Sequence, residues 1–329
     1  MNPSPTSPRR PSRQPWTKER LIHERAVAIG AALEPGTALA YSSALQSYLS
    51  FCHAHQLPVE PTTDTLSFYV VYMCAHIKPQ SVEAYLSGIC ARLEPFFPHV
   101  HDNRRHAVVT KCLVGCKKMY TTNATRKSAL PHALLSQILS TGFPSPSHDE
   151  FLFRAILAVG WHGIMRLGEL VWPDNLDLQD YRKVIMHLSV EVLPGGFSFI
   201  LPGHKGDRLF EGNRVVVLHT CSPDDPIQPF SNYLKSRDSL FPYNPELWLR
   251  ADGSIPHRRW FISLLHVFLP KEYGGHSLRS GGATALAEAG IPEELIRRAG
   301  RWSSDAFEIY IRNHPTLLAS ILMNRCSDT

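Results

Sequence analysis

Apolar residues recur every three or four positions over most of the chain, which is the spacing of one face of an α-helix. The segment that carries Val82, Leu86, Ile89 and Leu93 is a clear example. Four or five such segments lie between residues 16 and 120, where signals for β-strands are weak. We therefore expect residues 16–120 to form a compact bundle of four or five helices.

Single residues indicate where three of these helices begin. Thr37 and Asp64 have side chains that can accept from unpaired amides at a helix N-terminus. Pro79 suits the first turn, where its missing N–H costs nothing. We therefore expect Thr37 and Asp64 to be N-caps, and we expect a third helix to open at Pro79.

The second half of the chain combines helical and alternating patterns. Helical spacing resumes at residues 132–139 and again near Asp149, whereas residues 183–191, 197–201 and 214–218 read as strands. A Leu-Pro-Gly-Gly sequence separates the first two strands, as in a hairpin. The expected fold class is mainly α with a small antiparallel β-sheet.

Polar stretches divide the chain. Residues 1–15 are rich in Pro, Ser and Arg, which predicts a disordered basic arm. Residues 121–131 are polar and basic, which indicates a linker between a helical domain, 16–120, and a second domain, 132–329. A plain tail and a solvated loop are the alternatives for the two basic stretches.

Charge and composition narrow the class of partner. The net charge is +5 for 329 residues, but residues 100–130 hold seven basic residues against one acidic. Clustered positive charge is typical of a polyanionic partner, although a solvated basic face is the alternative. The chain has no long apolar run and no apolar core near its N-terminus, so we expect no membrane span and no secretory signal. Seven scattered cysteines favour reduced thiols in an intracellular protein.

Candidate chemistry concentrates near the C-terminus. His276 and Arg279 are three residues apart, so they share one face of a helix. Gly290 is a natural helix stop, Pro292 a natural new start, and Gly300 a second stop. A His and an Arg held in this way suit a phosphate group. A nearby tyrosine can attack phosphorus and hold it covalently, which requires neither cofactor nor metal.

This stretch resembles the C-terminal signature of the tyrosine recombinases, the class that includes lambda integrase and Cre. Their pattern is His-x-x-Arg, then Gly-(Arg or His)-(His or Trp), then a nucleophilic Tyr eight or nine residues later. The matching residues here are His276 and Arg279, then Gly300-Arg301-Trp302, then Tyr310. Tyr310 follows Trp302 by eight residues, one fewer than in Cre-like members. The amino-acid sequence of this stretch is most similar to recombinases of eukaryotic mobile elements of the Crypton and DIRS-like kinds.

A second signature of the family, (Ala or Met)-Arg-x-x-Glu-Leu, matches Met165 through Leu170. It identifies Arg166 as the first catalytic arginine. A structural ion pair between Arg166 and Glu169 is the alternative, because a charge in an apolar segment is costly unless paired. The family places a catalytic lysine at the turn between the second and third strands, where Lys205 is the candidate and Arg208 the fallback. A surface lysine at a hairpin tip is the alternative for Lys205.

The resemblance implies a role for each site residue. Arg166 and Arg279 clamp the phosphate, and His276 assists by hydrogen bonding or proton removal. Lys205 protonates the departing 5′-hydroxyl, and Tyr310 becomes joined to the 3′-phosphate. Trp302, the remaining member of the predicted catalytic set, donates its indole N–H. No cofactor and no metal are implied.

The resemblance also implies an N-terminal core-binding (SAM-like) domain and a C-terminal catalytic domain. Residues 81–92 resemble the core-binding helix that runs along DNA. The candidate DNA contacts are Lys78, Gln80, Ser81, Tyr85, Arg104, Arg105, Lys117, Lys118, Arg126 and Lys127. The implied partner is double-stranded DNA, bound by a homotetramer on two duplexes. The last helix, with Leu317 and Leu318, would dock on a neighbouring subunit or on its own domain.

The predicted function is a site-specific DNA recombinase or integrase of a mobile element, nuclear in a eukaryote and cytoplasmic otherwise. Two alternatives stay open. A domesticated protein could bind DNA without cutting it, with Glu294 through Arg301 as the reading helix of a helix-turn-helix. A topoisomerase of the related type IB class would relax DNA as a monomer.

Overall fold

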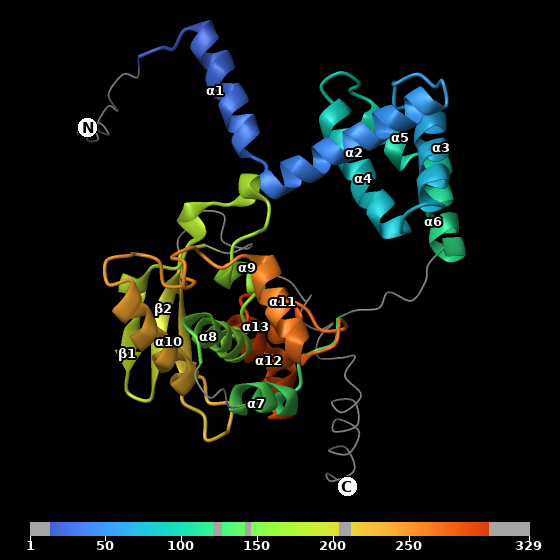
Figure 1. Ribbon diagram of the computed structural model, residues 1–329. Coiled ribbons are helices and arrows are strands. Elements are labelled where there is room, and N and C mark those ends of the chain that lie inside the picture. Colours follow the sequence, from blue (N-terminus) through green and yellow to red (C-terminus); the bar gives the residue numbers. More distant parts are fainter. Residues whose placement is uncertain (1–13, 121–126, 142–145, 204–211, 303–329) are drawn as a thin grey trace, which may run out of the picture. The chain divides into compact units, whose positions relative to one another are not determined.

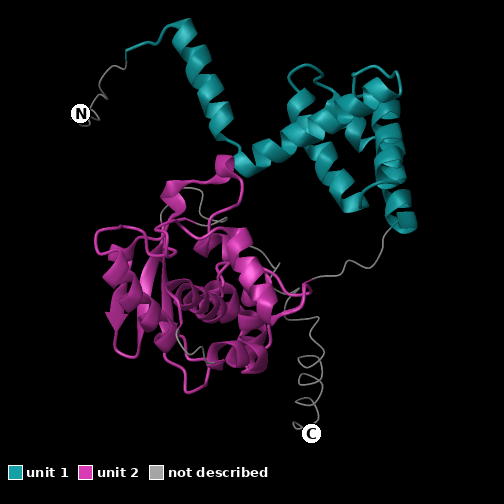
Figure 2. Cartoon of the chain, in the orientation of Figure 1, with its two compact units in different colours: residues 1–124 teal, residues 125–329 magenta. Residues whose placement is uncertain are grey.

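The computed structural model describes residues 14–120, 127–141, 146–203 and 212–302 (Figure 1). The chain divides into two compact units, residues 1–124 and 125–329 (Figure 2). Most of the predicted arm and linker, and all residues after Trp302, lie outside the described residues. The finer division into arm, binding domain, linker and catalytic domain stays a prediction.

The first unit is helical, as the periodicity predicts. Its helices are α1 (Lys18–Ala31), α2 (Pro35–Ala54), α3 (Thr63–Cys74), α4 (Pro79–Leu93), α5 (Val100–Arg105) and α6 (Ala107–Tyr120). The apolar faces of α2, α3, α4 and α6 meet in one core, in which Tyr48, Tyr69 and Leu86 are fully buried. Helix α1 contributes no buried residue.

Two of the three predicted helix starts in this unit need correction. Helix α2 begins at Pro35, with Glu34 as its N-cap, so Thr37 lies inside the first turn. The helix begins at the proline because the fixed φ of proline already suits the first turn. The N-cap of α3 is Thr62, whose hydroxyl accepts from the Thr65 amide, and Asp64 instead places its charge near the helix N-terminus. Helix α4 opens at Pro79, as predicted.

The second unit is built around helix α8. Its helices are α7 (His132–Ser140), α8 (His148–His162), α9 (Leu167–Leu170), α10 (Ile227–Leu240), α11 (Arg258–Phe268), α12 (Ser277–Glu288) and α13 (Glu293–Ala299), with 3₁₀ turns at Leu176–Leu178, Tyr181–Lys183 and His187–Ser189. Helix α8 is buried from Leu152 to Trp161 apart from Arg154, because its sequence is apolar on nearly every side. Helices α7, α9, α10 and α12 pack around it (Figure 1).

Helix α12 approaches α8 closely because it presents two glycines. A Cβ on Gly281 would overlap the Leu130 carbonyl, and one on Gly282 would overlap the Trp161 carbonyl. The second turn of α12 is therefore held against the end of α8, shortly before Arg166.

The sheet is small and antiparallel, with strand order β1 (Glu191–Leu193), β2 (Gly196–Leu201), β3 (Asn213–Leu218). Phe197 pairs with Val217 and Phe199 with Val215, and these four side chains face the core. The predicted fold class, mainly α with a small antiparallel sheet, is confirmed.

The first strand was predicted over residues 183–191, and this is wrong because the strand begins only at Glu191. The preceding backbone binds another part of the chain. The His187 amide donates to the Pro245 carbonyl over 2.7 Å, and the Leu247 amide donates to the Ile185 carbonyl over 2.9 Å. This tertiary pairing uses the groups that a longer β1 would need.

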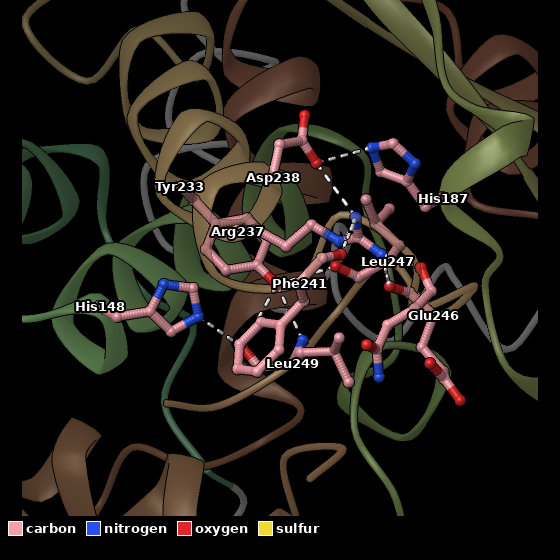
Figure 3. Close-up of polar contacts among 10 residues, drawn as sticks. His148, His187, Tyr233, Arg237, Asp238, Phe241, Glu246, Leu247 and Leu249 are labelled. Carbon is pink, nitrogen blue, oxygen red and sulfur yellow. Dashed lines mark hydrogen bonds and ion pairs between the residues drawn. The ribbon is translucent and has the colours of Figure 1, made fainter. Parts of the chain in front are cut away.

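The segment that receives this pairing is fixed by a buried polar network (Figure 3). The Tyr233 hydroxyl, on α10, donates to the Leu247 carbonyl and accepts from the Leu249 amide, both over 2.8 Å. Arg237 is 1% exposed and donates to the carbonyls of residues 241, 244 and 246. These contacts give hydrogen-bond partners to a non-helical backbone, of which residues 247–249 are buried.

Candidate active site

The loop between α8 and α9 places the first signature arginine. After α8 ends, Ile164 adopts φ of 48°, a left-handed conformation that is uncommon for a β-branched residue. Arg166 then precedes α9, and its side chain and backbone are both held by Glu169. The Arg166 Nη1 lies 2.8 Å from Glu169 Oε1, and the Arg166 amide donates to Oε2 over 2.9 Å. The structural ion pair considered from the sequence is therefore present.

The second signature arginine comes from α12 and is almost fully buried. Arg279 is 2% exposed. Its Nη1 donates to the Ile164 carbonyl over 2.7 Å, and its Nη2 donates to the Gly300 carbonyl. The Trp302 ring lies over the guanidinium, with Cζ 3.9 Å from the ring centroid, which is a cation–π contact.

Gly300 makes this stacking possible. A Cβ at position 300 would overlap the Trp302 ring. The glycine that the family signature requires therefore leaves room for the indole beside Arg279.

Arg301 joins the two arginines. It has φ of 57°, and its Nη2 lies 3.4 Å from both the Ile164 carbonyl and Glu169 Oε2. Arg166 and Arg301 thus share the Glu169 carboxylate, and Arg301 and Arg279 share the Ile164 carbonyl. Burial lowers the pKa of Arg301 from its usual value, and Glu169 opposes this effect. Guanidinium donors held in fixed positions suit a phosphate group.

His276 is the N-cap residue of α12 and is exposed, one turn before Arg279. Basic side chains flank the glycines that precede it. A Cβ on Gly275 would touch the Arg258 guanidinium, and one on Gly274 would contact the Lys127 stem. The N-terminus of α12 is therefore lined by cationic groups.

Four of the six predicted catalytic residues can be placed. Arg166, Arg279 and Trp302 meet in one cluster, and His276 lies on the helix that carries Arg279. Lys205 and Tyr310 lie outside the described residues, as do Arg126 and the C-terminal helix with Leu317 and Leu318. The catalytic roles stay predictions.

Arg301 was not among the candidate catalytic residues. The sequence did contain a signal for it, because Arg301 stands nine residues before Tyr310, the spacing that Trp302 lacks.

Several candidate DNA contacts have partners within the protein. Lys117 forms a 2.6 Å ion pair with Glu83, Arg104 donates to Ser87 over 3.0 Å, and Arg105 lies 3.7 Å from Asp102. Lys127 donates to the Lys271 carbonyl. Tyr85 is half-buried, whereas Lys78, Gln80, Ser81 and Lys118 are exposed. The exposed residues are the ones best placed to meet a ligand.

Two observations concern the described residues as a whole. These residues contain no group of three or more His, Cys, Asp or Glu side chains arranged to hold a metal ion. Within the same ranges, no helix has both the length and the apolar character that crossing a bilayer requires.

No protein-family model and no curated protein matches the chain. Solved structures do match. A lambda integrase dimer bound to a COC′ core site has a TM-score of 0.54 at 14% identity, over 89% of this chain and 76% of that one. XerH site-specific recombinase bound to a palindromic difH substrate, in a post-cleavage complex, has 0.51 at 13% identity, over 79% and 69%. Tn1549 transposon integrase in complex with circular intermediate DNA has 0.50 at 13% identity, over 85% and 98%.

These neighbours define the class to which the architecture belongs. The chain has the fold of the tyrosine recombinases, as the two sequence signatures predicted. At 13–14% identity the likeness shows the fold alone.

Proposed function

We propose that this protein is a site-specific DNA recombinase or integrase that cleaves and rejoins DNA through a 3′-phosphotyrosine intermediate. The observation that carries the proposal is the cluster of Arg166, Arg279 and Arg301. It forms from segments far apart in the sequence, on a fold shared with recombinases solved on DNA. Because a buried charge is costly unless it is paired, three guanidinium groups held through one carboxylate and one carbonyl favour an anionic ligand.

The proposed reaction begins with capture of a DNA phosphodiester by Arg166 and Arg279. The Tyr310 hydroxyl attacks phosphorus, a phosphorus–oxygen bond to tyrosine forms, and the bond to the 5′-oxygen breaks. The two arginines stabilise the charge that develops on the pentavalent transition state. His276 hydrogen-bonds to the phosphate or takes the tyrosine proton, and Lys205 gives a proton to the departing 5′-oxygen.

The second half of the reaction is the reverse of the first. The 5′-hydroxyl of another strand attacks the phosphotyrosine, the bond to Tyr310 breaks, and the tyrosine recovers its proton. Strands are exchanged without hydrolysis. The Trp302 indole N–H is the proposed further donor to the phosphate in both halves.

The wider setting is proposed on the same basis. Double-stranded DNA is the partner, held through the exposed polar residues of α4 and the basic groups near the N-terminus of α12. Four subunits on two duplexes form the working assembly. A mobile element of the Crypton or DIRS-like kind is the proposed source, with action in the nucleus in a eukaryotic host.

Covalent trapping tests the proposal. Wild type and a Tyr310→Phe variant are incubated with a library of nicked duplexes, in which a cleaved strand escapes and leaves the protein attached to DNA. We expect an adduct with wild type and with Tyr273→Phe, and none with Tyr310→Phe. Tyr273 is the matched control because it is the other tyrosine near the signature and is buried.

Two other outcomes would replace the proposal. Binding of duplex by wild type with no Tyr310-dependent adduct would leave a DNA-binding protein that does not cut. Relaxation of supercoiled plasmid with no preferred site would favour a topoisomerase.

A further inference from the structure

Arg301 contacts the support of each signature arginine with a single nitrogen. Its Nη2 lies 3.4 Å from Glu169 Oε2 and 3.4 Å from the Ile164 carbonyl. The Glu169 carboxylate also holds Arg166, and the Ile164 carbonyl also holds Arg279. Arg301 is therefore the residue through which the two supports meet.

The backbone adopts an uncommon conformation at both ends of this contact. Ile164 and Arg301 both have positive φ, 48° and 57°. Residues with a Cβ rarely take this conformation, and a β-branched residue is a genuine outlier. Such conformations persist only where the surroundings hold them, and they concentrate at functional sites.

Burial gives a second, independent observation. The Arg301 side chain is 10% exposed. Its Nε is buried and has no hydrogen-bond partner among the residues that the structure describes. A buried donor without an acceptor destabilises a fold. The backbone strain and the unsatisfied donor therefore oppose stability together, which is expected of a residue kept for function.

We propose that Arg301 is a positioning residue, which fixes the guanidinium groups of Arg166 and Arg279 relative to each other through Glu169 and the Ile164 carbonyl. This inference rests on the proposed function, because it concerns the phosphate site of that reaction. Donors fixed before the substrate arrives need no reorganisation in the transition state. A loss of Arg301 leaves both arginines in the chain but loosens the geometry between them.

The test separates DNA binding from the chemical step. Arg301→Gln removes the charge, Arg301→Lys keeps it with a single donor group, and Arg298→Gln is the control. The Arg298 side chain is exposed and forms an ion pair with its helix neighbour Glu294. Duplex affinity and the rate of adduct formation at saturating protein are measured for each variant.

We expect Arg301→Gln to lower the adduct rate by about 100-fold, the size of effect seen when one preorganised donor is lost. Its duplex affinity should stay within about threefold of wild type, because Arg301 acts through other residues. Arg301→Lys should recover part of the rate, and Arg298→Gln should match wild type. A wild-type rate for Arg301→Gln would overturn the inference.

A double-mutant cycle tests the route through Glu169. If Arg301 acts through that carboxylate, Glu169→Gln with Arg301→Gln should be no slower than the slower single variant, because coupled residues are not additive. Losses that multiply would contradict the Glu169 route.

A measurement that needs no catalysis separates the positioning role of Arg301 from the proposed recombinase function. In ¹⁵N spectra of the DNA-free protein, the Nε–Hε signals of Arg166 and Arg279 should move in Arg301→Gln and stay in Arg298→Gln. If wild type forms no adduct, the proposed function fails and these spectra still decide the role of Arg301. Unchanged signals in Arg301→Gln would overturn it. Arg301→Lys replaces Arg301→Gln in every measurement if thermal unfolding shows that the latter does not fold.

Discussion

The indole ring of Trp302 covers the guanidinium of Arg279, with the Arg279 Cζ 3.9 Å from the ring centroid. The same guanidinium donates to two backbone carbonyls, so its charge is held between a π-face and two dipoles. This arrangement holds Arg279 in place before the phosphate of the proposed reaction would bind. It also links Trp302 to the site by a contact that does not depend on the indole N–H.

Replacement of the ring should therefore separate its two roles. Trp302→Phe keeps a π-face over Arg279 but loses the N–H, whereas Trp302→Leu loses both. We expect Trp302→Leu to destabilise the protein by about 0.5–2 kcal/mol relative to Trp302→Phe, which is the range of a cation–π contact. Thermal unfolding of both variants measures the difference. Equal stability of the two variants would show that the stacking contributes nothing.

Gly300→Ala should disturb the stacking of Trp302 on Arg279 although neither of these two residues is replaced. The new methyl group would occupy the space of the Trp302 ring, so the ring has to move away from Arg279. We expect slower adduct formation than wild type together with an Arg279 Nε–Hε signal that moves. Adduct formation at the wild-type rate would mean that the position of the ring is unimportant for cleavage.

The close approach of α12 to α8 gives a stability prediction. In Gly282→Ala the new methyl group overlaps the Trp161 carbonyl oxygen. The substitution should destabilise the protein by about 1–3 kcal/mol, the cost of overpacking. Gly115→Ala is the control, because nothing lies within 4 Å of the new methyl group there. That substitution should stabilise α6 by about 0.5–1 kcal/mol, since alanine favours a helix interior. Chemical denaturation measures both, and a neutral Gly282→Ala would contradict the packing argument.

The network in Figure 3 predicts a cost for a single lost hydroxyl. Burial raises the pKa of Tyr233, so the phenol stays protonated and serves as both donor and acceptor. Tyr233→Phe leaves the Leu249 amide and the Leu247 carbonyl without that partner and should cost about 1–3 kcal/mol. Tyr243→Phe is the matched control, because Tyr243 is 96% exposed. Equal denaturation midpoints for the two variants would disprove the assigned role.

A histidine at the end of α8 predicts a dependence of stability on pH. His162 Nε2 lies 3.1 Å from the buried Asp224 carboxylate, and His132 approaches the other oxygen at 2.9 Å. Burial lowers the pKa of His162 below its ordinary 6.5, although Asp224 opposes this. The unfolded chain then binds more protons than the folded protein. The contribution of His162 is therefore complete above about pH 6.5 and is lost as the pH falls through the lowered folded value.

Thermal unfolding between about pH 5 and pH 8 measures this dependence. His162→Gln should flatten the loss of stability at the acidic end. Some slope should remain, because burial also lowers the pKa of His187. An unchanged acidic slope in His162→Gln would assign the effect to other groups.

Local signals allowed much of the fold to be predicted. Pro79 opens α4, and Pro292 with the two glutamates after it starts α13, because proline and acids suit a first turn wherever they occur. The strand predicted over residues 183–191 failed for the opposite reason. Its backbone pairs with Pro245 and Leu247, and no local pattern reveals a partner that distant.

The candidate site could likewise be predicted in part, where local sequence patterns report it. Signature spacing selected Arg166 and Arg279, and the structure places both in one cluster. The nine-residue spacing to Tyr310 points to Arg301, but its contacts with Glu169 and the Ile164 carbonyl depend on the left-handed backbone at residues 164 and 301, which sequence patterns do not report. Lys205 and Tyr310 lie outside the described residues, so their roles stay predictions.

Arg279 and Arg301 both donate to the Ile164 carbonyl, which is a backbone group and therefore leaves no trace in a sequence motif. Its position depends on the length of the turn between Trp161 and Arg166, and any residue able to hold the backbone there would offer the same oxygen. One inserted or deleted amino acid in that turn would aim the oxygen elsewhere. Such a chain would keep every side chain of the two signatures but would lose the contacts that hold Arg279 and Arg301, and with them the proposed phosphate site.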